Sequence, residues 1–278
     1  MGLVRTAFTK ATATVAAWNL AGFHGINDDR LARQADGLAL IDAEIVALVE
    51  VPSETELDKI KTILTDTYGL TYDSVFVDQE ASTSHPLNIA VLFKQGVTVT
   101  NAELLAGSDG GDPTRRRALL ADVKVDRFDF KLVAVHLKSG RESSSQKLRG
   151  EQCKVIGDYI THLRGPGDRN PDIILLGDFN MIPGQDISNF HHLGGDDLMD
   201  FVSSWDLQDR YSHILEAGRA NLLDGFAISR RFSTEYIRGS LRLFPLHWTM
   251  DMGRERFRRD VSDHLPFVAS FRTTRDRD

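Results

Sequence analysis

Short apolar runs, each followed by polar residues, recur along the whole chain. The clearest is Ile173-Ile174-Leu175-Leu176, which Gly177 separates from Asp178 and Asn180. Four branched apolar residues in a row are typical of a buried strand. Similar runs predict strands at residues 15–20, 44–49, 72–77, 88–93, 118–125 and 128–135, with the closing strands inside 222–228 and 261–271.

Helical spacing of apolar residues is found at fewer places. It predicts helices over residues 28–40, 55–67 and 146–163, and a further helix around 198–205. Ser53, directly after Pro52, is a suitable N-cap for the second of these. Residues 104–117 and 139–145 have the composition of loops, and 181–220 is of mixed character.

The order of these elements predicts the fold class. Strands outnumber helices, and pairs of strands separated by a helix alternate with hairpins such as the one with its turn at Asp126-Arg127. This mixture favours an α+β fold with two packed mixed β-sheets flanked by helices over one parallel, doubly wound sheet. No repeat or linker divides the sequence, so we expect a single domain over residues 1–278 with its core at about 15–270.

Composition narrows the class of protein. The chain has 278 residues, 41% apolar and 26% charged, as is ordinary for a globular protein. Cys153 is the only cysteine, which excludes an intrachain disulfide and a cysteine zinc cluster. The N-terminal residues do not have the pattern of a signal peptide, and no apolar window reaches membrane-spanning length. We therefore expect a cytoplasmic protein without a membrane span, and nothing implies a protein partner.

Charge distribution gives a weak indication of the substrate. The net charge of −7 argues mildly against a general nucleic-acid binder. Residues 226–260, however, contain eight arginines against four acidic residues and are locally +4. This segment leads into Asp263-His264, and a basic approach to a polar site suits a polyanionic substrate. Scattered ion pairs on a solvated loop are the alternative interpretation.

Polar side chains that can bind metal or move protons lie at or near the ends of these apolar runs. They are Asn19, Glu50, His136, Asp178, Asn180, Asp224, Asp263 and His264. Asp178 and Asn180 are two residues apart, so on an extended chain they would point the same way. Carboxylate and amide oxygens suit Mg²⁺, whereas zinc prefers several His or Cys ligands at close spacing, which the sequence does not show. Together with the histidines, such a set predicts metal-assisted hydrolysis.

Six ordered blocks resemble a known group of proteins. They are Ala17-Trp18-Asn19, Leu48-Val49-Glu50-Val51, Val135-His136-Leu137-Lys138-Ser139, Gly177-Asp178-Phe179-Asn180, Leu223-Asp224-Gly225-Phe226 and Ser262-Asp263-His264. In this order they resemble the endonuclease/exonuclease/phosphatase superfamily, which includes pancreatic deoxyribonuclease. The resemblance covers about residues 15–270. It implies a four-layer αββα sandwich with one active site at the rim shared by its two sheets.

The resemblance also implies roles for these residues. Glu50 would be the principal metal carboxylate, with Asn19 and Asp263 near the same Mg²⁺ or Mn²⁺ ion. Asp178 and Asn180 would position the attacking water and the scissile phosphate. His264, braced by Asp224, would act as base or bind the phosphate, and His136 is a candidate acid for the leaving oxygen. Which group takes the first proton stays open, because interacting groups titrate together.

Some positions depart from the superfamily pattern. Gly225 stands where many relatives carry a larger residue, which leaves room for a bulkier substrate or reflects drift. Asn88 stands near where a supporting glutamate is common, so His136 is expected to have a lowered pKa. Arg117 and Lys138 are candidate substrate contacts.

Three functions are compatible with this pattern. The first is a divalent-metal-dependent phosphodiesterase, specifically a nuclease that hydrolyses DNA or RNA. The second is a phosphatase or phosphodiesterase that acts on a small phosphoester, such as an inositol phosphate, a nucleotide or a lipid headgroup. The third is a non-catalytic binding module on the same fold, against which the intact polar set speaks.

Overall fold

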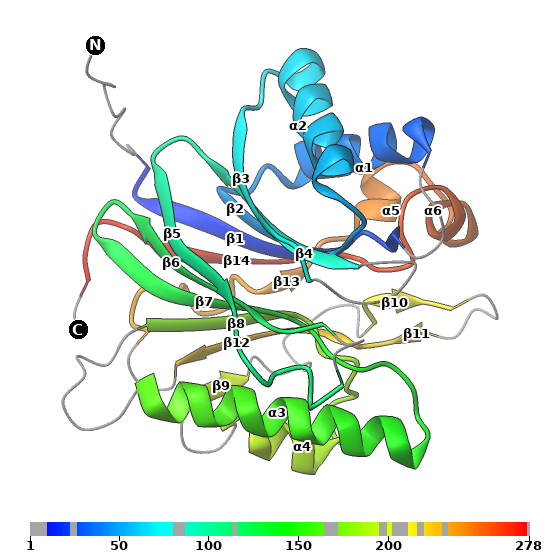
Figure 1. The fold of residues 1–278 in the computed structure, drawn as a ribbon. Coiled ribbons are helices and arrows are strands. Elements are labelled where there is room, and N and C mark those ends of the chain that lie inside the picture. Colours follow the sequence, from blue (N-terminus) through cyan, green and yellow to red (C-terminus); the bar gives the residue numbers. More distant parts are fainter. Residues whose placement is uncertain are drawn as a thin grey trace.

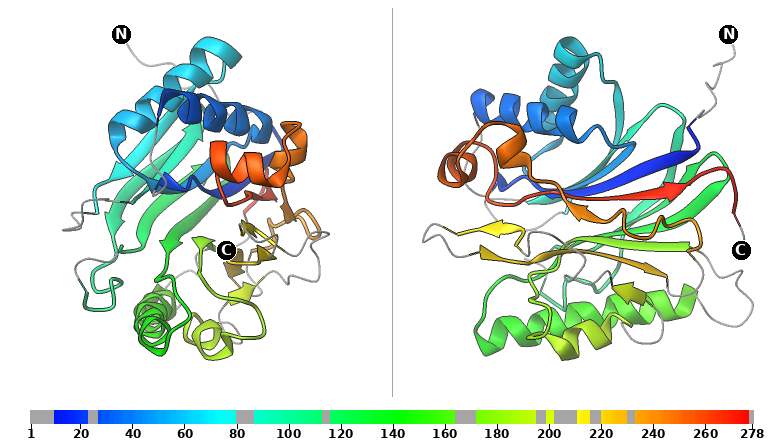
Figure 2. Two further views of the ribbon diagram at one scale, coloured as in Figure 1. Left: turned by 90° about the vertical axis from the view of Figure 1, so that its right-hand side faces the viewer. Right: turned by 180° about the vertical axis from the view of Figure 1, so that it is seen from behind.

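Two six-stranded sheets pack face to face, and helices cover their outer faces (Figures 1 and 2). The structure is a computed structural model, and it describes residues 10–22, 27–79, 87–112, 116–163, 172–194, 199–201, 211–215, 220–229 and 233–276. The arrangement is the four-layer αββα sandwich of two mixed sheets that the sequence predicts. The single-domain assignment over residues 1–278 stays a prediction.

The first sheet has the strand order β13-β14-β1-β2-β4-β3. Its strands are β1 (Thr12–Asn19), β2 (Ile45–Val51), β3 (Tyr72–Val77), β4 (Asn88–Lys94), β13 (Arg242–Leu243) and β14 (Phe267–Arg272). β1 pairs parallel with β2 and antiparallel with β14. The N-terminal and C-terminal parts of the chain therefore meet in the middle of one sheet.

The second sheet has the order β5-β6-β7-β8-β12-β9. Its strands are β5 (Val97–Leu104), β6 (Leu119–Val125), β7 (Phe128–His136), β8 (Asp172–Asp178), β9 (Met199–Phe201) and β12 (Asp224–Ser229). The predicted hairpin around Asp126-Arg127 is confirmed as β6 and β7. β7 and β8 are parallel and end at the same edge. A separate two-stranded ribbon, β10 (His213–Ile214) and β11 (Ala220–Asn221), lies at the end of the sandwich opposite the one where β1 begins.

Helices form the two outer layers. α1 (Asp28–Ile41), α2 (Glu54–Tyr68), α5 (Leu246–Thr249) and α6 (Arg254–Asp260) lie over the first sheet, and α3 (Ser143–Leu163) and α4 (Ile187–His192) lie over the second (Figure 1). The predicted cap is confirmed, because the Ser53 side chain accepts from Glu56 N–H. No helix among the described residues has the length and apolar character needed to cross a membrane.

The structure differs from the predicted elements in three places. α3 begins at Ser143, inside the predicted loop 139–145. Residues 97–104, which the sequence patterns left unassigned or in a loop, form the edge strand β5. The predicted helix around 198–205 is a strand at 199–201, where it pairs with β12, and residues 198 and 202–205 lie outside the described residues. Pairing with a neighbouring strand overrides local preference at such edges.

The alternation along the second sheet positions the polar strand ends. In β7 and β8, Leu132, Ala134, Ile174 and Leu176 pack in the core between the sheets, and their neighbours Val133, Val135, Ile173 and Leu175 pack under α3. Since side chains alternate with a period of two, His136 and Asp178 continue the rows that face the inter-sheet core. Asp224 precedes Phe226 and Ile228 in the same way on β12. The core therefore ends in a row of polar groups.

Candidate active site at the rim of the two sheets

His136, Asp178 and Asp224 form one row across three neighbouring strands. Asp178 is in register with His136 of β7 and with Asp224 of β12. All three residues are buried. Directly paired residues on one face lie side by side, so the sheet itself brings these groups together.

Gly177 allows the close approach of β7 and β8 just before this row. Its φ is +127°, and a Cβ at this position would lie 2.2 Å from the Val135 carbonyl oxygen. Only glycine adopts such a conformation without strain. The close packing of β7 and β8 therefore explains why the Gly-Asp-Phe-Asn block begins with a glycine, directly before the polar ends of the two strands.

Asn19 connects the two sheets. It ends β1, and its Nδ2 donates to Asp178 Oδ2 at 3.1 Å and to Glu50 Oε1 at 3.2 Å. Its Oδ1 accepts from Ala21 N–H at 2.8 Å, which fixes the orientation of the amide. One side chain from the first sheet thus holds carboxylates from both sheets.

Glu50 lies in a β-bulge of β2. The pairing with β4 shifts register between Val49 and Val51, and Glu50 has a φ of +58°. A left-handed non-glycine residue costs about 1–3 kcal/mol and persists where its surroundings fix it. Here Gly22 packs against the Glu50 backbone, because a Cβ on Gly22 would lie 2.2 Å from its carbonyl oxygen. The bulge re-aims the Glu50 carboxylate toward Asn19 and His136.

His264 is held by Asp224. Its Nδ1 lies 2.6 Å from Asp224 Oδ2, and its Nε2 lies 3.9 Å from both Asp178 Oδ2 and Asp263 Oδ1. Burial opposes a charge on this imidazole, but the charge and hydrogen bond of Asp224, with the charges of Asp178 and Asp263, raise the His264 pKa well above its ordinary value. Asp224 thus favours a charged imidazole facing Asp178.

His136 has the opposite electrostatics. Its Nε2 lies 3.6 Å from Glu50 Oε1 and 3.7 Å from Asp178 Oδ2. Burial, together with the positive charges of Arg116 and His264, lowers the His136 pKa well below its ordinary value. The lowered pKa was expected, although burial rather than the neighbouring amide is its first cause. A neutral imidazole can donate one N–H hydrogen bond but is a poor source of a proton.

Asp178 lies in an excess of negative charge. Burial, followed by the charges of Asp224 and Glu50, raises the Asp178 pKa to about 7, even though His264 and the Asn180 N–H bond oppose this. Three carboxylates with oxygen donors converge here, and a divalent cation would relieve their repulsion. The carboxylate oxygens of Glu50 and Asp178 are donors of the kind that a hard ion such as Mg²⁺ prefers, and the Asn19 NH₂ group holds both of them in place.

Comparison with known proteins rests on structure alone. No protein-family model matches the sequence, and no curated protein matches it significantly. Among solved structures, zebrafish (D. rerio) TDP2 complexed with a single-strand DNA product is 16% identical, with a TM-score of 0.70 over 95% of this chain and 100% of that one. The human Nocturnin catalytic domain with a bound sulfate anion is also 16% identical, with a TM-score of 0.65 over 95% and 96%.

A third similar structure carries the family name itself. It is an endonuclease/exonuclease/phosphatase family protein of Bacteroides thetaiotaomicron, 16% identical, with a TM-score of 0.65 over 93% of this chain and 97% of that one. The chain has the endonuclease/exonuclease/phosphatase fold. The resemblance seen in the sequence is confirmed at the level of this fold.

Some candidate residues do not join the cluster on this fold. Asn180 has a φ of +51°, so the extended geometry predicted for Asp178 and Asn180 is wrong. Its Nδ2 donates to the Leu137 carbonyl, and its N–H donates to Asp178 Oδ1. Asn180 therefore supports Asp178 through its backbone, and its amide faces the end of β7.

The two candidate substrate contacts have local partners. Arg117 Nε lies 2.9 Å from Asp109 Oδ2, in an ion pair on the loop after β5. The Lys138 ammonium donates to the neighbouring Ser139 carbonyl. Arg116, one residue earlier than predicted, is the arginine whose charge acts on His136.

Gly225 does not open room for a substrate. A Cβ there would lie 2.6 Å from the Phe179 ring, which is buried on the α3 side of the sheet. Gly225 faces away from the site because Asp224 on the same strand faces it. Close packing of Phe179 therefore accounts for this glycine.

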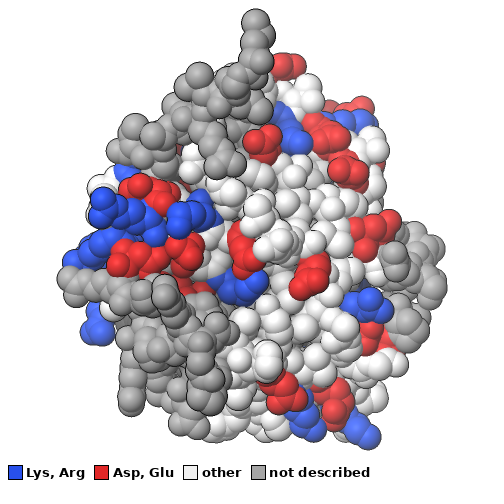
Figure 3. All heavy atoms as spheres, turned by 60° about the vertical axis from the view of Figure 1, so that its left-hand side comes forward, with Lys and Arg blue, Asp and Glu red and all other residues white. Residues whose placement is uncertain are grey.

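The basic segment is partly neutralised. On α6, Arg256 and Arg259 both pair with Asp260, which also binds Arg33 of α1, while Arg254 stacks on Tyr211. Arg230 and Arg231 lie outside the described residues. Figure 3 draws the face at the other end of the molecule, around the start of β1, and there acidic and basic side chains are interspersed. Charge alone therefore gives little support to a polyanionic substrate.

Sequence patterns missed Arg30 and His213. Buried Arg30 donates to the Ala21 carbonyl, and the charges of Asp263 and Glu50 act on it from two sides. His213 lies on the two-residue strand β10, and its Nε2 is 3.5 Å from Asp263 Oδ2. Neither position follows a long apolar strand, which was the signal that identified the others.

Proposed function

We propose that this protein is a Mg²⁺- or Mn²⁺-dependent phosphodiesterase and, more specifically, a nuclease. The observation that carries the proposal is the Asn19 amide bonded to both Glu50 and Asp178, beside the Asp224–His264 pair. This arrangement puts oxygen ligands, a buried carboxylate and an oriented imidazole at one rim. Metal-assisted hydrolysis of a phosphate ester needs these three elements.

Each group has a role in this proposal. Glu50 and Asp263 would hold the ion, with Asn19 orienting the Glu50 carboxylate through its Nδ2 donor, and the ion would supply Lewis-acid stabilisation of the phosphate oxygens. Asp178, supported by the Asn180 N–H, orients the attacking water by accepting its hydrogen bond. His264, charged and fixed by Asp224, binds the negative phosphate. His136 donates its N–H to a substrate or leaving oxygen without giving up a full proton.

Nucleic acid is the preferred substrate because of one comparison. Zebrafish TDP2, which shares the fold over 95% of this chain, was solved with a single-strand DNA product. The direct test incubates the purified protein with plasmid, linear DNA and RNA in Mg²⁺ or Mn²⁺, with and without chelator. Cleavage that stops with EDTA supports the nuclease, and intact substrates in Mn²⁺ would exclude it.

A small phosphoester is the second candidate substrate. The overall charge of −7 and the pairing of the α6 residues Arg256 and Arg259 with Asp260 favour it, because neither attracts a polyanion. Phosphate release from a panel of inositol phosphates, nucleotides and lipid headgroups, without cleavage of nucleic acid, would decide for this alternative.

The matched control distinguishes catalysis from contamination and from a silent binding module. Asp178→Ala should abolish any phosphoester hydrolysis, whereas Asp129→Asn, an exposed carboxylate on β7, should leave it unchanged. Equal activity of Asp178→Ala and the parent protein in every assay would refute the assigned site and favour a binding module.

A further inference from the structure

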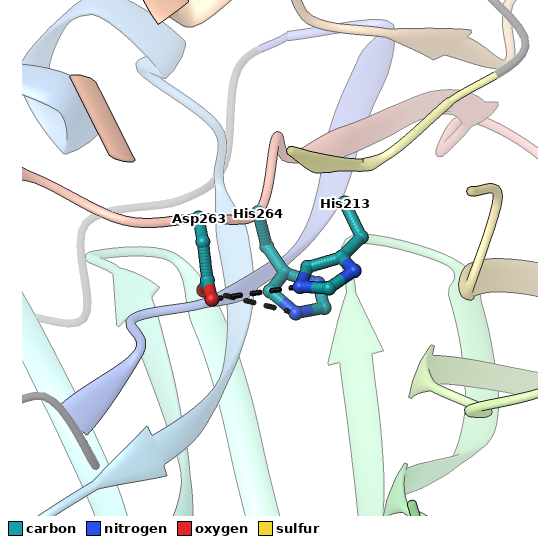
Figure 4. Close-up of side chains that lie close together, drawn as sticks. All are labelled: His213, Asp263 and His264. Carbon is teal, nitrogen blue, oxygen red and sulfur yellow. Dashed lines mark ion pairs between the residues drawn. The ribbon is translucent and has the colours of Figure 1, made fainter. Parts of the chain in front are cut away.

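His213, Asp263 and His264 form a second group of possible metal ligands at the rim. Figure 4 shows both imidazoles directed at the same carboxylate. His213 Nε2 lies 3.5 Å from Asp263 Oδ2, and His264 Nε2 lies 3.9 Å from Asp263 Oδ1. One ligand atom from each residue lies within 4.8 Å of the others.

These distances suit a small divalent ion bound between the three side chains. Zinc–nitrogen and zinc–oxygen bonds of about 2.0–2.1 Å at a tetrahedral angle separate neighbouring ligand atoms by about 3.3 Å. The observed separations of 3.5 and 3.9 Å, which run to the two different oxygens of Asp263, exceed this value by about 0.2 and 0.6 Å. Side-chain rotation alone can supply such a contraction.

The donor set differs from that around Glu50. Two imidazoles and one carboxylate are the ligands of zinc and related transition ions, whereas Mg²⁺ prefers oxygen alone. Because Asp224 Oδ2 is bonded to His264 Nδ1 at 2.6 Å, the Nε2 atom is the one turned toward Asp263. A carboxylate behind a ligating histidine fixes its orientation and strengthens it as a ligand. Zn²⁺ bound at Nε2 would displace the proton that the charged His264 carries there, and this proton would pass to the solvent.

Backbone contacts hold His213 in place against the other two residues. Ile214 N–H donates to the Asp263 carbonyl at 2.7 Å, and Leu265 N–H donates to the Ser212 carbonyl at 2.7 Å. The two imidazole rings are 4.6 Å apart between centroids. The segment that carries His213 is thus fastened on both sides to the segment that carries Asp263 and His264.

We infer that His213, Asp263 and His264 form a binding site for Zn²⁺ or a similar nitrogen-preferring divalent ion. Water would complete the coordination of the ion. The site shares Asp263 with the proposed Mg²⁺ ligands, so zinc bound here withdraws a ligand from the catalytic ion. Inhibition by zinc rests on the proposed function, because it requires a catalytic ion. Zinc binding to the three residues does not depend on that function.

The test measures metal binding without any substrate. Calorimetric titration of Zn²⁺ into the parent protein, in excess Mg²⁺, should show one site per chain, and Co²⁺ in its place should give the visible absorption of a four- or five-coordinate ion. His213→Phe keeps an aromatic ring beside His264 but removes both nitrogens. It should weaken Zn²⁺ binding by at least about tenfold and remove the Co²⁺ absorption.

The controls separate the possible outcomes. His192→Phe removes an exposed histidine of α4 and should bind Zn²⁺ as the parent does. His213→Gln serves if the phenylalanine variant fails to fold, and a shift of the His213 imidazole NMR signals on adding Zn²⁺ gives a readout without substitution. No Zn²⁺ binding by the parent, or equal binding by His213→Phe, would overturn the site. Since no substrate is present, failure of the nuclease proposal would leave this result unaffected.

Discussion

Asp178 lies in an environment that disfavours its own charge. It is 2% exposed, and its pKa of about 7 lies well above the ordinary carboxyl value of about 3.9. Because the Asp178 pKa is higher in the folded protein than in the unfolded chain, its effect on stability depends on pH. In acid the carboxyl is protonated in both states and its burial does not oppose folding, but at higher pH ionisation favours the unfolded chain. The resulting penalty grows as the pH rises from about 4 to about 7 and is complete above that.

Replacing Asp178 by Asn should therefore stabilise the metal-free protein. The amide keeps the shape but carries no charge, so we expect the free energy of unfolding at pH 8 in EDTA to rise by about 1–3 kcal/mol. At pH 4.5 the gain should be much smaller. Urea unfolding of both proteins at the two pH values measures the difference, and a variant less stable than the parent at pH 8 would contradict it. Any hydrolytic activity should fall by about 10³-fold.

His264 and Asp224 should act as one unit. Because Asp224 acts through the His264 imidazole, Asp224→Asn and His264→Gln should each lower the turnover rate by about 10²–10³-fold. The double variant should then lose little more than the worse single variant. Single-turnover rates of the parent, the two single variants and the double variant give the double-mutant cycle that tests this. Losses that multiply would show that Asp224 has a separate role, and Asp129→Asn provides the unaffected control.

At the scale of elements, the junction of β7 and β8 depends on Gly177. Gly177→Ala would put a methyl group 2.2 Å from the Val135 carbonyl in a backbone conformation that alanine rarely adopts. We expect a loss of about 3 kcal/mol or more of stability. Gly184→Ala has a φ of +82° but nothing within 4 Å, so it should lose only about 1–2 kcal/mol. Chemical denaturation compares the two, and equal losses would show that the close approach is not the cause.

The sequence predicted the elements in which burial leaves a clear pattern of apolar residues: central strands buried on both faces and helices buried on one. β2 and β8 contain continuous apolar runs, β7 alternates at its start and is apolar over residues 132–135, and α1, α2 and α3 carry clear helical spacing. β5 and β9 lie at sheet edges, where pairing with one neighbour decides the structure and few buried positions mark the sequence. Such strands are visible only after their partners are placed.

Residues of the candidate site could be predicted from the sequence where they adjoin a buried strand, and not elsewhere. Asn19, His136, Asp178 and Asp224 follow or precede buried strands, so their convergence at the rim could be expected. The bulge that turns Glu50 and the left-handed turn at Asn180 depend on backbone angles that no alternation reveals. His213 comes from a two-residue strand, and only the pairing of distant segments brings it to Asp263.

At the scale of the whole molecule, the metal should stabilise the fold that assembles its ligands. Glu50 comes from the first sheet and Asp178 from the second, and their repulsion acts across the sandwich until a cation offsets it. Binding only to the folded protein adds about 1.4 kcal/mol at ten times the dissociation constant, which raises Tm by about 2–4 °C in a chain of this size.

Thermal unfolding in Mg²⁺ and in NaCl of equal ionic strength measures this effect. The rise in Tm with Mg²⁺ should be lost in Glu50→Gln, whose amide oxygen can still accept from Asn19, and kept in Glu103→Gln, an exposed residue of β5. A rise of equal size in Glu50→Gln would place the ion elsewhere. Because the ligands come from both sheets, we expect the stabilisation to appear as one cooperative transition shifted upward, not as a second transition.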